Sequence, residues 1–216
     1  MDDLEQQIKS WSTFYSLQKK GRKKFGSIWR IPLSKKLMHV IAPLLHDGMS
    51  VLDVGAHDRK LESKITALNS TIHYKSLDID PFGNHDYRSF DEIKEKFDIA
   101  ILSEVIEHLT FPEGVHLLQQ IESVLKPGGA IVVSTPNMKH PHRYWTSPDH
   151  ITPYNFDALA GILMMAGFEL ENMHRIHNQP FFPFYFRRWI GSWLHWYLDI
   201  DFALSIVAVG RASKKT

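Results

Sequence analysis

Two stretches of sequence decide the fold: residues 97–109, FDIAILSEVIEHL, and residues 125–137, LKPGGAIVVSTPN. Each contains a short apolar run, FDIAIL or AIVV, that ends in polar residues. The segment between them has the apolar spacing of an amphipathic helix near residues 115–125. Short apolar strands that alternate with such helices are typical of a parallel sheet wrapped by helices, so the pair predicts an α/β protein.

The same alternation extends on both sides of this centre. Further strands are predicted at residues 49–54, 72–77, 168–173 and 204–209, and helices at residues 60–68 and 155–166. Ahead of them, Ser34 is placed to cap a helix that ends at Gly48, with Pro43 as a kink or a break. We therefore expect a sheet domain over residues 48–216, preceded by a helical, basic extension over residues 1–47.

Composition narrows the classes of function. The 216 residues include 13 histidines and no cysteine, and the formal net charge is +1. The lack of cysteine excludes a disulfide scaffold, a cysteine nucleophile, a cysteine-bound zinc and an iron–sulfur cluster. Any metal is then expected to bind His, Asp or Glu side chains. No signal peptide and no apolar run of transmembrane length is visible, so a cytoplasmic protein is expected.

Two of the predicted strands end in an aspartate, Asp53 and Asp78. Ligands of an open parallel sheet bind beyond the carboxyl ends of its strands, and a carboxylate there can accept hydrogen bonds from a ribose diol. Asp78, 25 residues after Asp53, has the position for this role. The alternative is a plain turn residue, because Asp80 and Pro81 follow. The pattern alone indicates a nucleotide-like ligand.

Five motifs, in this order, resemble those of class I S-adenosylmethionine-dependent methyltransferases: VLDVG at 51–55, SLDIDP at 76–81, the two stretches above, and DHITPYNFDALAGILMMAGFE at 149–169. The resemblance covers about residues 48–210. It is greatest with the branch that holds the ubiquinone-biosynthesis O-methyltransferases and the small-RNA 2′-O-methyltransferases. It implies a Rossmann-like, doubly wound sheet of seven mostly parallel strands, with the last strand antiparallel.

The resemblance also implies S-adenosylmethionine as the cofactor. Asp53 and Gly55 would line its methionine end, and Asp78 would hold its ribose. The remaining expected contacts are Ile79 beside the adenine, and Ser103 and Glu104 beside the sulfonium and methyl group.

One departure lies in the glycine loop, which in the family reads Asp/Glu-x-Gly-x-Gly-x-Gly. Here His57 and Arg59 replace the last two glycines, at positions where the backbone approaches the ligand closely and can need a positive φ. Either side chain could block the cofactor, turn outward, or pair with the cofactor's carboxylate.

The stretch 81–96 is also short for the family's third strand and its helix. Since only Gly55 of a dinucleotide-binding G-x-G-x-x-G is present, a dehydrogenase is disfavoured.

The resemblance further implies a divalent-metal site for Mg²⁺, Mn²⁺, Fe²⁺ or Zn²⁺, formed by Glu104, Glu107, His108 and His150. If residues 104–108 are helical, the first three of these side chains share one face. A metal there would lower the pKa of an acceptor hydroxyl. Alternatively, Glu104 and His108 act without a metal, with His108 as general base, or these side chains only organise the loop. His140 and His142 lie on the loop after STPN, where they either shape the substrate pocket or have no role.

Ten of the 26 aromatic residues lie in segment 181–202. Trp189, Trp193, Trp196 and Tyr197 have the spacing of one helical face, with Arg187 beside them. We expect this face to pack on the core or to form a homodimer. The alternatives are that it caps an apolar substrate or lies on a membrane surface.

These observations favour a methyltransferase acting on an oxygen of a small or amphiphilic acceptor. Residues 1–40 carry nine basic against three acidic residues, so RNA 2′-O-methylation is the first alternative. A non-catalytic binding protein with the same fold is the second, because the glycine loop is degenerate.

Overall fold

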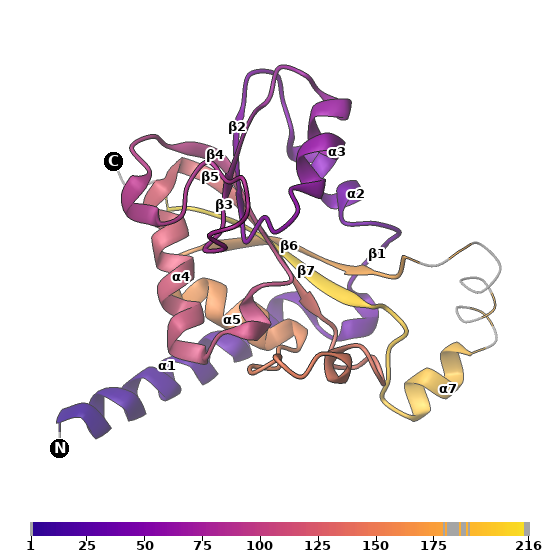
Figure 1. Cartoon of the computed structure of the whole chain (residues 1–216). Helices are drawn as coiled ribbons and strands as arrows, with labels where there is room; N and C mark the ends of the chain where they lie inside the picture. The colour runs from indigo at the N-terminus through magenta and orange to yellow at the C-terminus, as the bar shows by residue number, and fades with distance from the viewer. Residues whose placement is uncertain (1, 179, 181–185, 187–188, 190, 214–216) are drawn as a thin grey trace.

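The computed structural model describes residues 2–178, 180, 186, 189 and 191–213. They form one sheet in the order β1-β6-β7-β5-β4-β2-β3 (Figure 1). Neighbouring strands are parallel except where β7 pairs with β5 and with β6. The expected seven-stranded, mostly parallel sheet with an antiparallel last strand is therefore confirmed. The strands are β1 (Leu33–Ser34), β2 (Ser50–Val54), β3 (His73–Leu77), β4 (Phe97–Ser103), β5 (Leu125–Pro136), β6 (Glu169–Ile176) and β7 (Ser205–Arg211).

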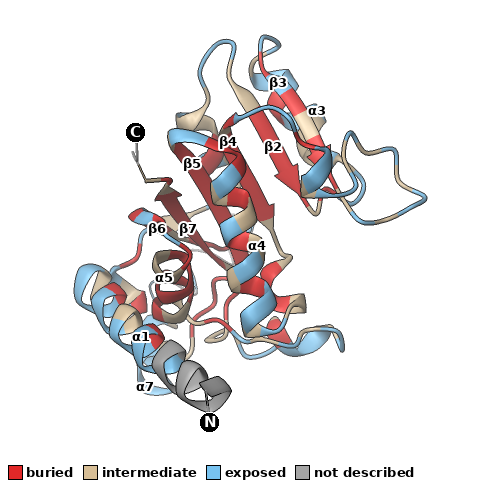
Figure 2. Ribbon diagram, turned by 90° about the vertical axis from the view of Figure 1, so that its left-hand side faces the viewer, coloured by how far each residue is buried: buried red, intermediate tan, exposed pale blue. Residues whose placement is uncertain are grey.

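Helices cover both faces of this sheet, and the strands are buried between them (Figure 2). Within β4, Ala100 and Leu102 belong to one core cluster, whereas Ile99 and Ile101 belong to the other. Successive side chains of a strand point to opposite faces, so a strand covered on both sides is apolar at every position. The longer helices are α1 (Asp2–Phe25), α3 (Lys60–Leu68), α4 (Phe111–Val124) and α5 (Phe156–Met165), and the short ones are α2 (Met38–Ile41) and α7 (Ser192–Tyr197).

Helix starts follow from local sequence. Thr110 and Glu113 form a reciprocal capping box at the start of α4, and the Asn155 side chain accepts from the Ala158 N–H at the start of α5. Helix α3 has the predicted bounds. The helix expected from Ser34 is wrong in part: Ser34 ends β1, α2 begins at Met38, and Pro43 lies in the 3₁₀ turn Ala42–Leu44.

One of the seven strands differs from those of the family pattern. Among the described residues, segment 81–96 holds only the 3₁₀ turn Phe90–Glu92 and one isolated bridge between Leu77 and Tyr87. The seventh strand is instead β1, which pairs with β6 at the opposite edge. The short 81–96 segment thus leaves β3 as the edge strand beside the expected cofactor site.

Helix α1 packs lengthwise on α5. At the crossing, a Cβ placed on Gly21 would lie 2.6 Å from the Cβ of Ala160, so the close approach requires glycine. Phe14 is buried, and Arg22 forms an ion pair with the buried Asp157. No helix among the described residues is long and apolar enough to cross a membrane.

The aromatic segment divides into two parts. Phe202 is buried, as expected for core packing, but Trp189, Trp193, Trp196 and Tyr197 are 67–74% exposed. Packing on the core is therefore wrong for these four residues. Phe181, Phe182, Phe184, Tyr185, Arg187 and Arg188 lie outside the described residues.

Candidate active site

The expected cofactor-binding residues gather at the carboxyl ends of β2, β3 and β4. Gly55 follows β2, and its N–H donates to the Leu77 carbonyl at 2.8 Å. Two residues on, the His57 N–H donates to Oδ2 of Asp78 at 2.7 Å, while the Asp80 N–H donates to Oδ1 at 3.0 Å. The first of these two bonds fixes the Asp78 carboxylate to the loop after β2. The loop contributes only a main-chain N–H group to it.

The loop keeps a glycine-type backbone although two glycines are replaced. Gly55, His57 and Arg59 have φ values of 71°, 43° and 55°, all in the left-handed region. A Cβ on Gly55 would meet Cγ2 of Val105 at 2.4 Å, so this position also has no room for a side chain. The left-handed backbone conformation costs His57 and Arg59 about 1–2 kcal/mol each relative to glycine.

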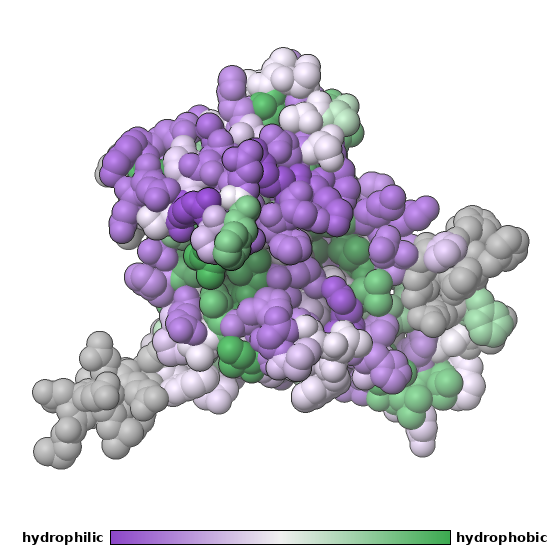
Figure 3. Space-filling view, viewed as in Figure 1, coloured by the Kyte–Doolittle hydropathy of each residue, from purple (hydrophilic) through white to green (hydrophobic). Residues whose placement is uncertain are grey.

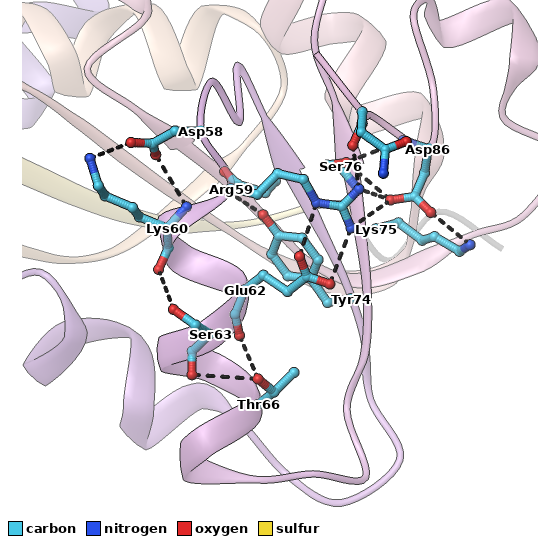
Figure 4. A network of polar contacts seen from close by, with 12 residues as sticks. Asp58, Arg59, Lys60, Glu62, Ser63, Thr66, Tyr74, Lys75, Ser76 and Asp86 are labelled. Carbon is cyan, nitrogen blue, oxygen red and sulfur yellow. Dashed lines mark hydrogen bonds and ion pairs between the residues drawn. The ribbon is translucent and has the colours of Figure 1, made fainter.

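Arg59 turns away from the strand ends (Figure 4). Its guanidinium makes a bidentate pair with Glu62 at 2.9 and 3.1 Å and donates to the Asn84 carbonyl at 2.6 Å. It also lies 3.4 Å from Asp86 and stacks over the Tyr74 ring. The Arg59 side chain is held by these protein groups and is only 23% exposed. His57 is exposed.

Asp53 is buried beneath the loop. The Tyr74 hydroxyl donates to its Oδ2 at 2.6 Å, and burial raises the pKa of Asp53 to about 6, partly offset by this bond. Burial and the neighbouring Asp53 carboxylate raise the pKa of the Tyr74 hydroxyl, so it stays a donor. Ile79, which follows Asp78, is in contrast 86% exposed.

Ser103 and Glu104 lie at the end of β4, next to the end of β5. Glu104 has a φ of 55°, and its N–H donates to the Ser134 carbonyl at 3.0 Å. Its carboxylate accepts from the Ser134 hydroxyl at 3.1 Å and from Arg143 at 2.9 Å. Ser103 and Ser134 are linked through their hydroxyls at 3.1 Å. Arg143 thus neutralises Glu104 at the expected position of the methyl group.

Glu107, His108 and His150 come together next to Glu104 and Arg143, each with a ligand atom within 4.8 Å of the others. Glu107 is buried, accepts from Thr135 at 3.0 Å through Oε2, and has no protein partner for Oε1. Burial, and secondarily the Glu104 carboxylate, raise the pKa of Glu107 to about 8. An unpartnered buried carboxylate oxygen is costly unless a proton or a cation occupies it.

Both imidazoles have one nitrogen engaged. Nδ1 of His150 lies 2.6 Å from the Tyr144 carbonyl, and Nδ1 of His108 lies 3.1 Å from Oδ2 of Asp149. Such bonds place the proton on Nδ1 and leave Nε2 as an acceptor or a metal ligand.

Residues 104–108 are not helical throughout, so the shared helical face considered for Glu104, Glu107 and His108 does not form. Only Ile106–His108 is helical, as one 3₁₀ turn, and Glu104 lies before it with a left-handed backbone. Three of the four expected metal ligands are therefore brought together by the turn and the 149–150 loop, while Glu104 is held by Arg143 and Ser134.

Some residues of this site were missed at the sequence level, namely Tyr74, Thr135 and Arg143. Thr135 belongs to the quoted STPN motif, so its place beside the site was accessible from sequence, whereas nothing near Tyr74 or Arg143 signals a polar partner. His140 accepts at Nδ1 from the Arg143 N–H at 3.1 Å and thereby shapes the turn that presents Arg143.

A groove of about 840 Å³ opens from Ser103 and Glu104 along α2 and α3. Its apolar wall includes Leu37, Met38, Ala42, Leu61, Ala67 and Leu68, and its basic residues are Lys36, Lys64 and Arg143. The groove therefore offers an apolar surface with cations along it, directly beside the expected methyl position.

The fold, the acidic strand ends and the cofactor loop define a class of nucleotide-cofactor transferases. The sequence profile described as "Methyltransferase domain" matches residues 29–172, well over half of the chain, and the chain belongs to this family. Membership of this family makes S-adenosylmethionine the expected cofactor. No curated protein sequence matches the chain significantly.

Solved structures confirm the fold. A SAM-dependent methyltransferase from Archaeoglobus fulgidus has a TM-score of 0.64 at 17% identity, covering 81% of this chain and 90% of its own. A chain of the complex between the Haloferax volcanii Trm112 methyltransferase activator and a methyltransferase has a TM-score of 0.59 at 15% identity, covering 94% and 97%. The cyclase SpnF also has a TM-score of 0.59 at 15% identity, covering 83% and 80%. Since one fold serves different reactions, the acceptor has to be argued from the site.

Proposed function

We propose that the chain transfers the methyl group of S-adenosylmethionine to an oxygen of a small or amphiphilic acceptor, as in the ubiquinone-biosynthesis O-methyltransferase branch. The single observation that carries this proposal is the Glu107–His108–His150 cluster beside the expected methyl position. Oxygen methylation requires an acceptor hydroxyl to lose its proton, and this cluster is where a proton can be taken up. The apolar groove suits the body of such an acceptor.

The residues of the cluster fit a divalent cation. Glu107, whose Oε1 has no protein partner, offers one carboxylate, and His108 and His150 offer two imidazoles, a set that suits Mn²⁺, Fe²⁺ or Zn²⁺, with Mg²⁺ the least suited. A bound cation would supply Lewis-acid lowering of the acceptor's hydroxyl pKa.

The chain's own residues have separate roles in the proposal. Asp149 orients His108, and where no cation is bound the free ring nitrogen of His108 accepts the hydroxyl proton. Arg143 holds Glu104 so that its carboxylate and the Ser103 hydroxyl line the path between donor and acceptor. Asp78 binds the ribose, and the loop at Gly55 to Arg59 covers the methionine end. Methyl transfer then needs in-line positioning of the acceptor oxygen.

Calorimetry with S-adenosylmethionine and S-adenosylhomocysteine, followed by transfer of labelled methyl to hydroxylated aromatic and amphiphilic acceptors, tests the proposal. We expect both cofactor forms to bind, and Asp78→Asn to weaken binding by roughly tenfold or more. Binding of neither form, or labelling of nitrogen rather than oxygen acceptors, would contradict it.

RNA 2′-O-methylation is the second candidate. It is favoured by the exposed lysines of α1, Lys19, Lys20 and Lys23, which form no ion pair among the described residues. A basic stripe of this kind suits a phosphate backbone. Labelled methyl found on small RNA, with a loss of transfer in the triple lysine-to-glutamine variant, would support this candidate over the first.

A further inference from the structure

The chain connecting β6 and β7 is much longer than the pairing of these strands requires. Two neighbouring antiparallel strands can be joined by about two to five residues, yet residues 177–204 intervene here and contain α7. The connection leaves and re-enters the sheet at the carboxyl edge, where Ile176, Asn178 and Leu204 line the groove. Its position is therefore at the mouth of the acceptor site.

The connection carries an exposed aromatic surface, which we define as Phe186, Trp189, Trp193, Trp196, Tyr197 and Leu198. The exposed fractions of its side chains range from 52% to 74%. Figure 3 shows some hydrophobic residues, in green, among pale ones at the lower right, where α7 lies in Figure 1. Scattered single apolar residues are normal on a protein surface, but six exposed aromatic and aliphatic side chains within 13 residues of one connection are typical of an interaction site.

The base of this surface is held firmly. Asp201, fully buried, pairs with Arg175 at 2.9 Å and accepts from the Asn137 amide at 2.9 Å. The Leu204 N–H donates to the Ile176 carbonyl at 2.7 Å, and the His195 ring packs on Phe202 with centroids 5.7 Å apart. The fold thus presents α7 outward by specific contacts.

Charge and residue type indicate what the surface binds. The acidic residues of the connection are already paired, Asp199 with Lys139 and Asp201 with Arg175. Lys35 and Lys36 are exposed where the connection begins, and the Asn178 N–H donates to the Lys35 carbonyl. Exposed tryptophan and tyrosine, with lysines at the start of the same connection, suit the boundary of a bilayer, where the ring enters the acyl region and the cation meets anionic headgroups.

We propose that the aromatic surface binds peripherally to anionic lipid bilayers. Helix α7, of six residues, is far too short to span one, so the surface lies in the interface. The bilayer would then adjoin the groove mouth, and an amphiphilic acceptor would enter the site from the membrane. This last step rests on the proposed O-methylation, whereas bilayer binding itself does not.

Vesicle flotation of the full chain tests the proposal. Vesicles of phosphatidylcholine alone are compared with vesicles containing 30 mole per cent phosphatidylglycerol, a probe composition of about one-third anionic lipid. We expect binding to the anionic vesicles that weakens in high salt, and a drop of roughly tenfold or more in the triple variant Trp189→Ala, Trp193→Ala, Trp196→Ala. Lys35→Gln with Lys36→Gln should weaken binding to the anionic vesicles selectively.

Matched controls separate the alternatives. Tyr197→Ala is paired with Tyr15→Ala, an exposed tyrosine of α1 on another part of the molecule, and only the first should weaken binding. The same samples are tested for S-adenosylhomocysteine binding and for mass in solution. No vesicle binding by a chain that binds the cofactor overturns the inference and leaves the proposed function intact. A dimer that the triple variant dissociates, without vesicle binding, assigns the surface to a second copy of the chain and also overturns it.

Discussion

The backbone N–H of His57 donates a hydrogen bond to the carboxylate of Asp78, with 2.7 Å between the two heavy atoms. This bond joins the loop after β2 to the end of β3, the two places where the cofactor is expected. It uses main-chain atoms of a residue whose φ is 43°. The contact therefore depends on backbone conformation and is indifferent to the imidazole.

We predict that His57→Gly retains cofactor binding. Glycine adopts a positive φ without steric cost, so the variant should keep its affinity for S-adenosylhomocysteine within about twofold and unfold at the same or a higher temperature. His57→Val should be less stable than wild type by roughly 1 kcal/mol, because a β-branched side chain is more strongly disfavoured at positive φ than histidine. Calorimetry and thermal unfolding measure both effects. Loss of binding in His57→Gly would mean that the imidazole itself contacts the cofactor.

Gly55 offers a stricter test of the loop. Its φ is 71°, and an added Cβ would meet Cγ2 of Val105 at 2.4 Å. Gly55→Ala is expected to lower stability by roughly 2–4 kcal/mol, the sum of the backbone and overpacking costs, and to weaken cofactor binding. Adding Val105→Ala removes the clash but not the backbone cost, so it should restore part of the loss. Full recovery would show that φ is unimportant at this position.

The sequence allowed the central architecture to be predicted because the strands are buried on both faces and are separated by strongly patterned helices. The bounds of α3 and the place of β4 follow from this patterning. The edge strands of the sheet were not predictable from the sequence. Strand β1 has only two residues, Leu33 and Ser34, and pairs with a strand about 140 residues later, a long-range contact that local patterns do not encode.

The candidate site, like the sheet, could be predicted from the sequence only in part. Asp78 and Gly55 lie together as the strand order requires. The pairing of Glu104 with Arg143 and the contact of Arg59 with Asp86 depend on side-chain partners distant in sequence, and the 3₁₀ turn at Ile106–His108 was not predicted either. The exposure of Trp193 could not be foreseen either, because an aromatic helical stripe is more often buried.

Glu107 should make stability depend on pH. Its folded-state pKa of about 8 lies above its ordinary value, so it favours the folded state at low pH. That contribution is lost as pH rises from about 4.5 to about 8 and amounts to at most about 5 kcal/mol. In urea denaturation without divalent metal, Glu107→Gln should be relatively more stable than wild type at pH 8.5 than at pH 5. Glu169→Gln, on the surface, is the control, and an unchanged slope in Glu107→Gln would contradict the assignment.

The ion pair between Arg175 and Asp201 should be important for stability because both side chains are almost fully buried. Asp201→Asn leaves the guanidinium without a counter-charge, and we expect a loss of about 3–5 kcal/mol in denaturant unfolding. Glu171→Gln, which breaks the surface pair with Arg211, should cost less than about 1 kcal/mol. Adding Arg175→Met to Asp201→Asn should recover part of the loss. Equal costs for the buried and surface pairs would refute this expectation.

Metal binding at Glu107, His108 and His150 can be measured without an acceptor. Titration calorimetry of the chain with Mn²⁺, Fe²⁺, Zn²⁺ or Mg²⁺ is expected to give one site that competes with protons, because Glu107 must ionise to bind. His150→Ala should weaken the site by roughly 100-fold, whereas His142→Ala, on the same exposed loop, should leave it unchanged. Glu104→Gln should weaken metal binding less than Glu107→Gln does, because the Glu104 carboxylate is held by Arg143. If no cation gives heat and the metal content of Glu107→Gln equals that of wild type, the cluster acts without metal and His108 remains as the base.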